Sequence, residues 1–335
     1  MKKKLLLLFC IGLFICSNIL GCGNIEVKTA KDERGTQIKV GYMANYGSLW
    51  AVLNAIELGY MQDENLNVEL IEYVDGPAIV TALENGDIDV GYIGQGAHKL
   101  CINGKAKIFA LSHISNADAV IGAPGISSIE ELKGKIVAYV EGTSSEDILK
   151  MALKKENMTM NDVIGISLGK KEIVSAMTME GIEGVAIWSP YSLEILEQLE
   201  GTKVLADNLT FSDESVGLGS WITTEFYNEY NKRTLVRFTR ALFKAMDHSA
   251  NEHYEETASY VAEQIGINQE EAYKQRGDAK WLTGNEVVDG VKDGTVYEYY
   301  ELQRKGFVET DSVFDGPKVD EYVLFDIMLE ASTYE

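Results

Sequence analysis

One polar loop of this chain carries side chains that can hold a small anion. Thr143, Ser144 and Ser145 follow the alternating apolar pattern of a predicted strand at 136–140, and Glu141 belongs to the same loop. Their hydroxyl and N–H groups lie at a predicted helix N-terminus and can bind a carboxylate or a sulfonate. Serine and threonine also cap their own helices routinely, and both roles can hold together.

The first turn of that predicted helix already carries negative charge. Glu146 and Asp147 complement the positive end of the helix dipole and oppose a nearby anion. A zwitterion, or an apolar molecule with one polar end, therefore fits these charges better than a strongly anionic ligand.

Three further loops occupy the same position between a predicted strand and a predicted helix. Their candidate ligand-binding residues are Asn45, Tyr46, Gly47, Ser48, Gly76, Pro77, Gln95 and Gly96. Glycine lets a backbone approach a ligand closely, and Gln95 offers both a hydrogen-bond donor and an acceptor. Ordinary strand-to-helix turns account for the same residues, so both interpretations stay open.

Rings at strand ends can close over a ligand. We expect His113, Trp188 with its neighbour Ser189, and Trp221 to contribute to the site, with Tyr46 as the best aromatic candidate. These rings favour, weakly, a ligand with a flat or apolar body.

Other site chemistries lack their sequence patterns. The four histidines and Cys101 show no zinc-ligand spacing, and no nucleophile elbow, P-loop or dinucleotide-binding glycine motif occurs. Asp87 and Asp89 are expected to face solvent or to cap a turn. We expect no catalytic residues, no metal and no cofactor.

The N-terminus has the pattern of an export signal. Three lysines precede an apolar run from Leu5 to Ile15, which is too short for a membrane span, and the segment 19–22 ends in Gly21 and Cys22. It resembles a bacterial lipobox, which implies a lipid on Cys22 as the only membrane attachment. Cys101 is then the only cysteine in the folded part, so no internal disulfide is expected.

Charge narrows the range of partners. The formal net charge is −22, and the loss of Lys2, Lys3 and Lys4 with the signal makes it more negative. Such acidity repels phosphate backbones, so nucleic-acid binding is not expected.

Strand and helix patterns alternate along most of the chain. This alternation predicts an α/β fold with a mainly parallel sheet that is covered on both faces. Pro124 and Gly125 mark a break where the chain is expected to cross into a second lobe. The expected domains are a signal peptide at 1–21, a tether at 22–36, lobe 1 at 37–122, an inserted lobe 2 at 123–214, and a return to lobe 1 with C-terminal helices at 215–335.

Several motifs, in this order and spacing, resemble one family. They are Gly41-Tyr42, Gly76-Pro77, Asn85-Gly86-Asp87-Ile88-Asp89, Ser128-Ile129-Glu130-Glu131-Leu132-Lys133-Gly134-Lys135, Glu141-Gly142-Thr143-Ser144 and Ile187-Trp188-Ser189-Pro190-Tyr191. The chain is similar over nearly its whole mature length to ABC-importer substrate-binding proteins of the nitrate, sulfonate and taurine type. Many relatives have an aspartate where this chain has Ser189, so the identity of the ligand does not transfer.

The resemblance implies a two-lobed, type 2 periplasmic binding fold with a ligand cleft between the lobes. It implies a monomer that closes on a small molecule and delivers it to the permease and ATPase subunits of an ABC importer. A ligand-sensing lipoprotein is an alternative. So is an enzyme related to the pyrimidine-forming proteins of thiamin biosynthesis, although this chain lacks their cysteine-rich motif. Sulfonate or taurine, an amino-acid-like or aromatic compound, and a pyrimidine precursor remain candidate ligands.

Overall fold

The computed structural model describes residues 35–177, 181–310, 313–314 and 316–332. The expected signal peptide, the lipidated Cys22 and nearly all of the tether lie outside the described residues. Among the residues that are described, no helix is both long enough and apolar enough to cross a membrane.

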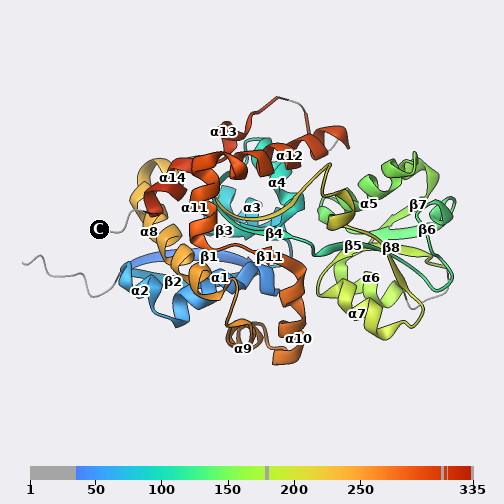
Figure 1. Cartoon of the computed structure of the whole chain (residues 1–335), viewed down its shortest axis with the longest axis horizontal. Helices are drawn as coiled ribbons and strands as arrows, with labels where there is room; N and C mark the ends of the chain where they lie inside the picture. The colour runs from blue at the N-terminus through green and yellow to red at the C-terminus, as the bar shows by residue number, and fades with distance from the viewer. Residues whose placement is uncertain (1–34, 178–180, 311–312, 315, 333–335) are drawn as a thin grey trace, which may run out of the picture. The chain divides into compact units, whose positions relative to one another are not determined.

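One mixed sheet has six strands in the order β11-β4-β10-β3-β1-β2 (Figure 1). Its strands are β1 (Thr36–Met43), β2 (Leu66–Tyr73), β3 (Val90–Ile93), β4 (Lys107–Ser115), β10 (Gly217–Thr223) and β11 (Ala279–Trp281). β1 pairs in parallel with β2 and β3, whereas β10 runs antiparallel to β3 and β4, and β11 antiparallel to β4. We call the part of the chain built on this sheet lobe A.

The helices of lobe A enclose one large apolar core. They are α1 (Tyr46–Glu57), α2 (Tyr60–Asp63), α3 (Gly76–Asn85), α4 (His98–Ile102), α8 (Glu225–Ser249), α9 (Tyr254–Ile265), α10 (Gln269–Lys274), α11 (Gly284–Asp293), α12 (Thr295–Glu309), α13 (Val319–Tyr322) and α14 (Phe325–Ala331), with 3-10 turns η1 (Gln95–Ala97) and η5 (Gln275–Asp278). Leu235, Phe238 and Leu242 recur at helical spacing along α8 and are fully buried. The helix α8 is therefore one of the C-terminal helices expected within 215–335, and its apolar face packs into the core.

A second sheet has five strands in the order β7-β6-β8-β5-β9, and we call its part of the chain lobe B. Its elements are β5 (Asp118–Gly122), η2 (Glu130–Leu132), β6 (Ile136–Tyr139), α5 (Ser144–Lys155), η3 (Met160–Asp162), β7 (Ile164–Ser167), α6 (Lys170–Met177), β8 (Gly184–Trp188), α7 (Tyr191–Gln198), β9 (Lys203–Asp207) and η4 (Asn208–Phe211). Side chains that alternate along β5 explain how both faces are covered. Val120 packs on the α5 side, whereas Ala119 and Ile121 pack on the side of α6 and α7 (Figure 1).

The strand 118–122 does not lie where the sequence predicts. The sequence predicts that residues 37–122 belong to lobe 1, but β5 pairs with β8 and β9 inside the five-stranded sheet of lobe B. The chain therefore leaves lobe A after Ser115, before the break at Pro124 and Gly125. Local turn signals marked a loop, but strand pairing decides which sheet a strand joins. The division into domains by residue range stays a prediction.

The sheets are also more mixed than the sequence predicts. β10 and β11 in lobe A run antiparallel to their neighbours, and so does β5 in lobe B. A parallel neighbour needs a long crossover connection, whereas a strand that returns from the other lobe can enter in either direction. Alternation of helix and strand patterns cannot distinguish these cases.

Candidate ligand-binding site

One cavity lies between loops of lobe A and loops of lobe B. It encloses about 700 Å³, counting the part open to solvent, which is in the size range of small-molecule sites. Its walls include loops that follow β1, β2 and β3 of lobe A and β6 and β8 of lobe B. This position agrees with the rule that ligands in open α/β sheets bind beyond the carboxyl ends of the strands.

Most of the site residues predicted from the sequence line this cavity. They are Asn45, Gly47, Gly76, Pro77, Gln95, Gly96, His113, Thr143, Ser144, Trp188 and Ser189. They come from loops far apart in the sequence, which the two sheets bring to one place. Direct contact of these residues with a ligand stays a prediction.

Two predicted aromatic residues lie in the core of lobe A instead of lining the cavity. The side chain of Tyr46 is 1% exposed, and its ring packs against Trp281 with 5.1 Å between ring centroids. Trp221 is fully buried between Tyr92 and Phe238. Tyr46 is the first residue of α1, and the helix turns its side chain toward the interior while Gly47 faces the cavity.

Ser48, Ser145 and Glu141 do not line the cavity either. The Ser48 hydroxyl accepts a hydrogen bond from the N–H of Met43 at 2.9 Å. The Ser145 hydroxyl donates to the carbonyl of Ala186 at 2.6 Å. Both serines therefore hold a helix onto its own sheet, and Glu141 is exposed.

Several residues that line the cavity were not predicted from the sequence. The polar and aromatic ones are Asp75, Tyr92, Ser115, Asp118, Gln275, Asp278 and Trp281. Asp75 directly precedes the Gly76-Pro77 motif and could have been found as a helix cap. Gln275, Asp278 and Trp281 lie in a stretch that the sequence indicates only as helical, and no local pattern connects it with the other loops.

Three helices that border the cavity begin with a side-chain cap. Asn45 accepts from the N–H of Ser48 at the start of α1, and Asp75 accepts from that of Ala78 at the start of α3. Thr143 accepts from the N–H of Ser145 at 3.3 Å at the start of α5. The capping interpretation of Thr143 is therefore confirmed, and these caps occupy N–H groups that could otherwise bind an anion.

His113 is a buried residue of the cavity wall, and its imidazole belongs to a polar network. Its Nε2 lies 3.1 Å from the Tyr92 hydroxyl, and its Nδ1 lies 3.2 Å from the hydroxyl of Ser112. Trp50 donates to the same Ser112 hydroxyl at 2.9 Å. Burial lowers the pKa of His113 to about 3, so the imidazole is neutral at pH 7 and gives the cavity no positive charge.

Two carboxyls line the cavity, and Asp118 is buried whereas Asp278 is half-buried. Burial raises the pKa of Asp118 to about 6, and nearby Ser144 and Asn208 oppose the rise. Burial also raises the pKa of Asp278 to about 7, where the nearby hydroxyl of Ser189 opposes the rise and the charge of Asp118 adds to it. The sequence predicts the loss of a carboxylate at Ser189, but the fold places these two carboxyls beside that residue.

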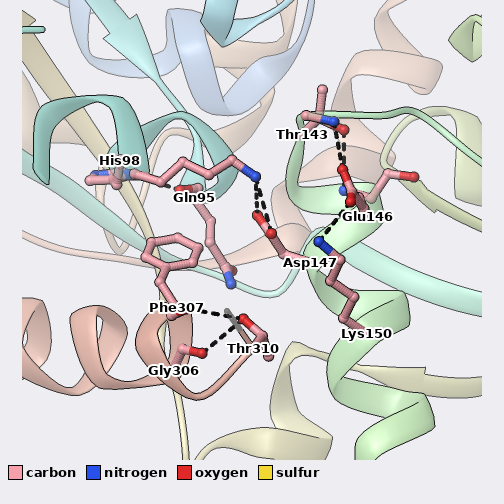
Figure 2. A network of polar contacts seen from close by, with 12 residues as sticks. Gln95, His98, Thr143, Glu146, Asp147, Lys150, Gly306, Phe307 and Thr310 are labelled. Carbon is pink, nitrogen blue, oxygen red and sulfur yellow. Dashed lines mark hydrogen bonds and ion pairs between the residues drawn. The ribbon is translucent and has the colours of Figure 1, made fainter. Parts of the chain in front are cut away.

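The two lobes also contact each other next to the cavity. Lys99 of α4 forms an ion pair with Asp147 of α5 at 3.1 Å, with the side chains 13% and 1% exposed. Asn208 of η4 donates to the side-chain oxygen of Gln95 at 3.0 Å. Figure 2 shows Asp147 facing the segment that carries Gln95 and His98. Both contacts therefore join a helical segment of lobe A to a helical segment of lobe B.

A separate cluster of side chains could hold a metal ion. His248, His253 and Glu256 each offer one ligand atom, and these atoms lie within 4.8 Å of one another. Among the described residues, this is the one group of three such side chains that could hold a metal ion. His248 lies in the last turn of α8, His253 is the N-cap residue of α9, and Glu256 lies in the first turn of α9. The spacing of the histidines matched no zinc motif, because the turn between the helices brings the three residues together. None of the three lines the cavity.

The family of the chain follows from its similarity to known proteins. Residues 48–256 match the family model described as NMT1/THI5 like. The chain is 30% identical over 297 residues to a Brucella abortus (strain 2308) protein provisionally named a binding protein, covering 88% of this chain and 89% of that one. The chain therefore belongs to the NMT1/THI5-like family.

Two further likenesses concern relatives with named ligands. The taurine-binding periplasmic protein of Escherichia coli (strain K12) is 25% identical over 195 residues, which cover 56% of this chain and 58% of that one. The crystal structure of the periplasmic aliphatic sulphonate binding protein SsuA from Escherichia coli has a TM-score of 0.67 at 19% identity, covering 86% of this chain and 92% of that one.

The periplasmic nitrate-binding protein NrtA from Synechocystis PCC 6803 has a TM-score of 0.63 at 13% identity and covers 89% of this chain and 88% of that one. The predicted family and the predicted periplasmic-binding-protein fold are thus confirmed. These relatives are named as binding proteins, which supports a solute-binding protein.

Proposed function

We propose that this chain is an extracytoplasmic solute-binding lipoprotein that captures a small organic molecule and delivers it to the permease and ATPase subunits of an ABC importer. One observation carries the proposal: a cavity of small-molecule size is lined by loops of both lobes. A ligand held there would contact both lobes at once. It would therefore stabilise the arrangement in which the lobes are closed.

The contacts beside the cavity support a closing movement. Lys99 and Asp147 bury opposite charges against each other across the two lobes, and such a pair stabilises only the arrangement in which both partners meet. Asn208 and Gln95 add a second buried polar contact. Closure would exclude water from the ligand, and the closed form would be the one that the importer recognises.

The proposed anchor rests on the sequence. A lipid on Cys22 would hold the folded part at the outer side of the cell membrane, and the extracytoplasmic location agrees with that of the periplasmic relatives. Replacement of Cys22 by serine is expected to move the chain from the membrane fraction to the soluble fraction. A Cys22→Ser chain that stays in the membrane fraction would contradict the anchor.

We also propose that the ligand is bound without being changed. Sulfonate- or taurine-like, amino-acid-like and aromatic molecules are the candidate ligands, because relatives are named for binding taurine and sulphonates and because Trp188 lines the cavity. The complex would contain one chain and one ligand.

A ligand screen tests the proposal. The full chain in detergent is screened by thermal shift against sulfonates, nitrate, amino acids, aromatic amines and acids, and pyrimidines. A ligand that binds only the native state must raise the melting temperature. We expect such a ligand to reduce the radius of gyration in small-angle scattering and to be recovered unchanged by mass spectrometry.

Each other outcome has its own meaning. A recovered product would indicate an enzyme, and binding without any change in scattering would contradict delivery by lobe closure. Light scattering that gives a dimer would contradict the monomer.

A further inference from the structure

The charged side chains that line the cavity are all negative. Asp75, Asp118 and Asp278 line it, and no lysine or arginine does so among the residues that the structure describes. His113 is the histidine in the wall, and burial keeps it neutral because its pKa is lowered to about 3. A ligand in this cavity meets carboxyl groups without a protein cation between them.

Cations close to the cavity have other partners. Lys99 is paired with Asp147. Lys170 donates to the carbonyl of Val74 at 2.6 Å. The positive charge of Lys170 lies near Asp75 and partly balances the negative charge of that carboxylate. In the part of the chain that the structure describes, the charged groups that influence the pKa values of Asp118 and Asp278 are other carboxylates.

Asp118 has an oxygen that is ready to accept a hydrogen bond. The residue is 4% exposed, and its Oδ1 has no hydrogen-bond partner among the described residues. Its other oxygen lies 3.4 Å from the side-chain nitrogen of Asn208. A buried carboxylate without a full set of donors is unfavourable, so a donor supplied by a ligand would be bound strongly.

The features that usually attract anions are weakened here. The N-termini of α1, α3 and α5 are capped by Asn45, Asp75 and Thr143, and one of these caps is itself a carboxylate. Glu146 and Asp147 occupy the first turn of α5, where each carboxylate is already paired with a lysine.

The rings in the cavity wall suit a cation as well. Tyr92, Trp188 and Trp281 line the cavity. The faces of aromatic rings carry partial negative charge and attract ammonium groups. The same rings offer apolar surface to the body of a ligand.

We infer that the ligand is a cation: a protonated amine on a flat or apolar body, with its ammonium group between Asp118 and Asp278. This inference rests on the proposed solute-binding function and names its ligand class. The N–H groups of the ammonium would donate to the free Oδ1 of Asp118 and to Asp278. A sulfonate in the same place would meet two carboxylates and no cation.

Matched probes of different charge test the inference. The full chain in detergent is titrated by calorimetry with benzylamine, phenylmethanesulfonate and benzyl alcohol, and with the 2-phenylethyl and 3-indolylethyl analogues of each. We expect the amines to bind, and the sulfonates and alcohols to bind at least about tenfold more weakly, as expected for a hydrogen bond between charged groups.

Asp118→Asn gives the decisive variant. It keeps the shape but removes the charge, so amine affinity should fall about ten- to hundredfold. The melting temperature of the ligand-free variant should not fall, because a neutral amide replaces a poorly solvated carboxylate. The control is Asp289→Asn, the same change at a side chain that is 74% exposed on α11, which should leave amine affinity within about twofold.

The outcomes separate this inference from the proposed function. Tighter binding of a sulfonate than of the matching amine, or unchanged amine affinity in Asp118→Asn, would overturn the inference that the ligand is a cation. If the lobes nevertheless close on the sulfonate, the proposed solute-binding function still stands. If no amine binds, the cation inference is wrong. If in addition no compound of the wider screen binds or changes the scattering, the proposed function is wrong as well.

Discussion

Gly96 of lobe A lies very close to the backbone of lobe B. A Cβ placed there would lie 2.1 Å from the backbone nitrogen of Ser144 and 2.5 Å from the backbone carbon of Thr143, whereas ordinary contacts begin at 3.4 Å. Both groups are main chain at the N-terminus of α5, so neither can rotate away like a flexible side chain. The variant Gly96→Ala must therefore move the lobes apart by about 1 Å or more to restore ordinary packing.

Such a movement would break the polar contacts between the lobes. The ion pair of Lys99 with Asp147 and the hydrogen bond of Asn208 with Gln95 have lengths of 3.1 and 3.0 Å, and hydrogen bonds weaken steeply beyond such distances. Loss of a buried ion pair costs about 3–5 kcal/mol. Because ligand affinity falls with the population of the competent form, we expect Kd to rise about a hundredfold or more.

Calorimetry with a ligand from the screen and small-angle scattering measure the two consequences. Gly96→Ala should bind weakly and keep the larger radius of gyration in the presence of ligand. Each lobe should stay folded, because the three atoms nearest to the added methyl group all belong to the opposite lobe. Gly277→Ala is the matched control, since a Cβ there has nothing within 4 Å. Wild-type affinity together with full closure in Gly96→Ala would refute the reasoning that binding needs this close approach.

Three further changes have defined outcomes. Lys99→Met removes the ion pair of the buried Asp147 with Lys99 and should weaken ligand binding about a hundredfold in calorimetry, whereas Lys99→Met combined with Asp147→Leu should recover much of it. Burial raises the pKa of Asp118 from 3.8 to about 6, so the folded ligand-free chain keeps a proton that the unfolded chain has released. Its free energy of unfolding should fall as pH rises through this window, and Asp118→Asn should flatten that slope in thermal unfolding. Tyr46→Ala removes a buried core ring and should cost about 3–5 kcal/mol in urea unfolding; an unchanged unfolding midpoint would contradict the core position.

The loops of the site were predictable because their signals are local. Glycine, proline and capping residues between a strand pattern and a helix pattern mark the turns at Asn45, Gly76, Gln95 and Thr143, and all four residues line the cavity. In an α/β fold such turns fall at the ends of strands, where ligands bind.

The direction of a side chain within such a loop was less predictable. Tyr46 and Gly47 are neighbours in sequence, yet the first packs in the core and the second lines the cavity. Successive side chains of a helix point about 100° apart. An error of one residue in the predicted helix start therefore changes which side chain is predicted to face the cavity. The same limit applies to Ser144 and Ser145.

The sequence by itself determined the family, the α/β fold and most of the loops that surround the cavity, because periodicity and turn chemistry depend on residues close together in the chain. Only the tertiary structure decided the charge of the cavity. Asp118 is the first residue of β5 in lobe B and Asp278 ends η5 in lobe A, about half the chain apart. Each taken alone resembles an ordinary surface aspartate. Their burial and their mutual repulsion arise only when strand pairing brings these two segments together, because a carboxyl acquires a raised pKa from the groups that surround it in space.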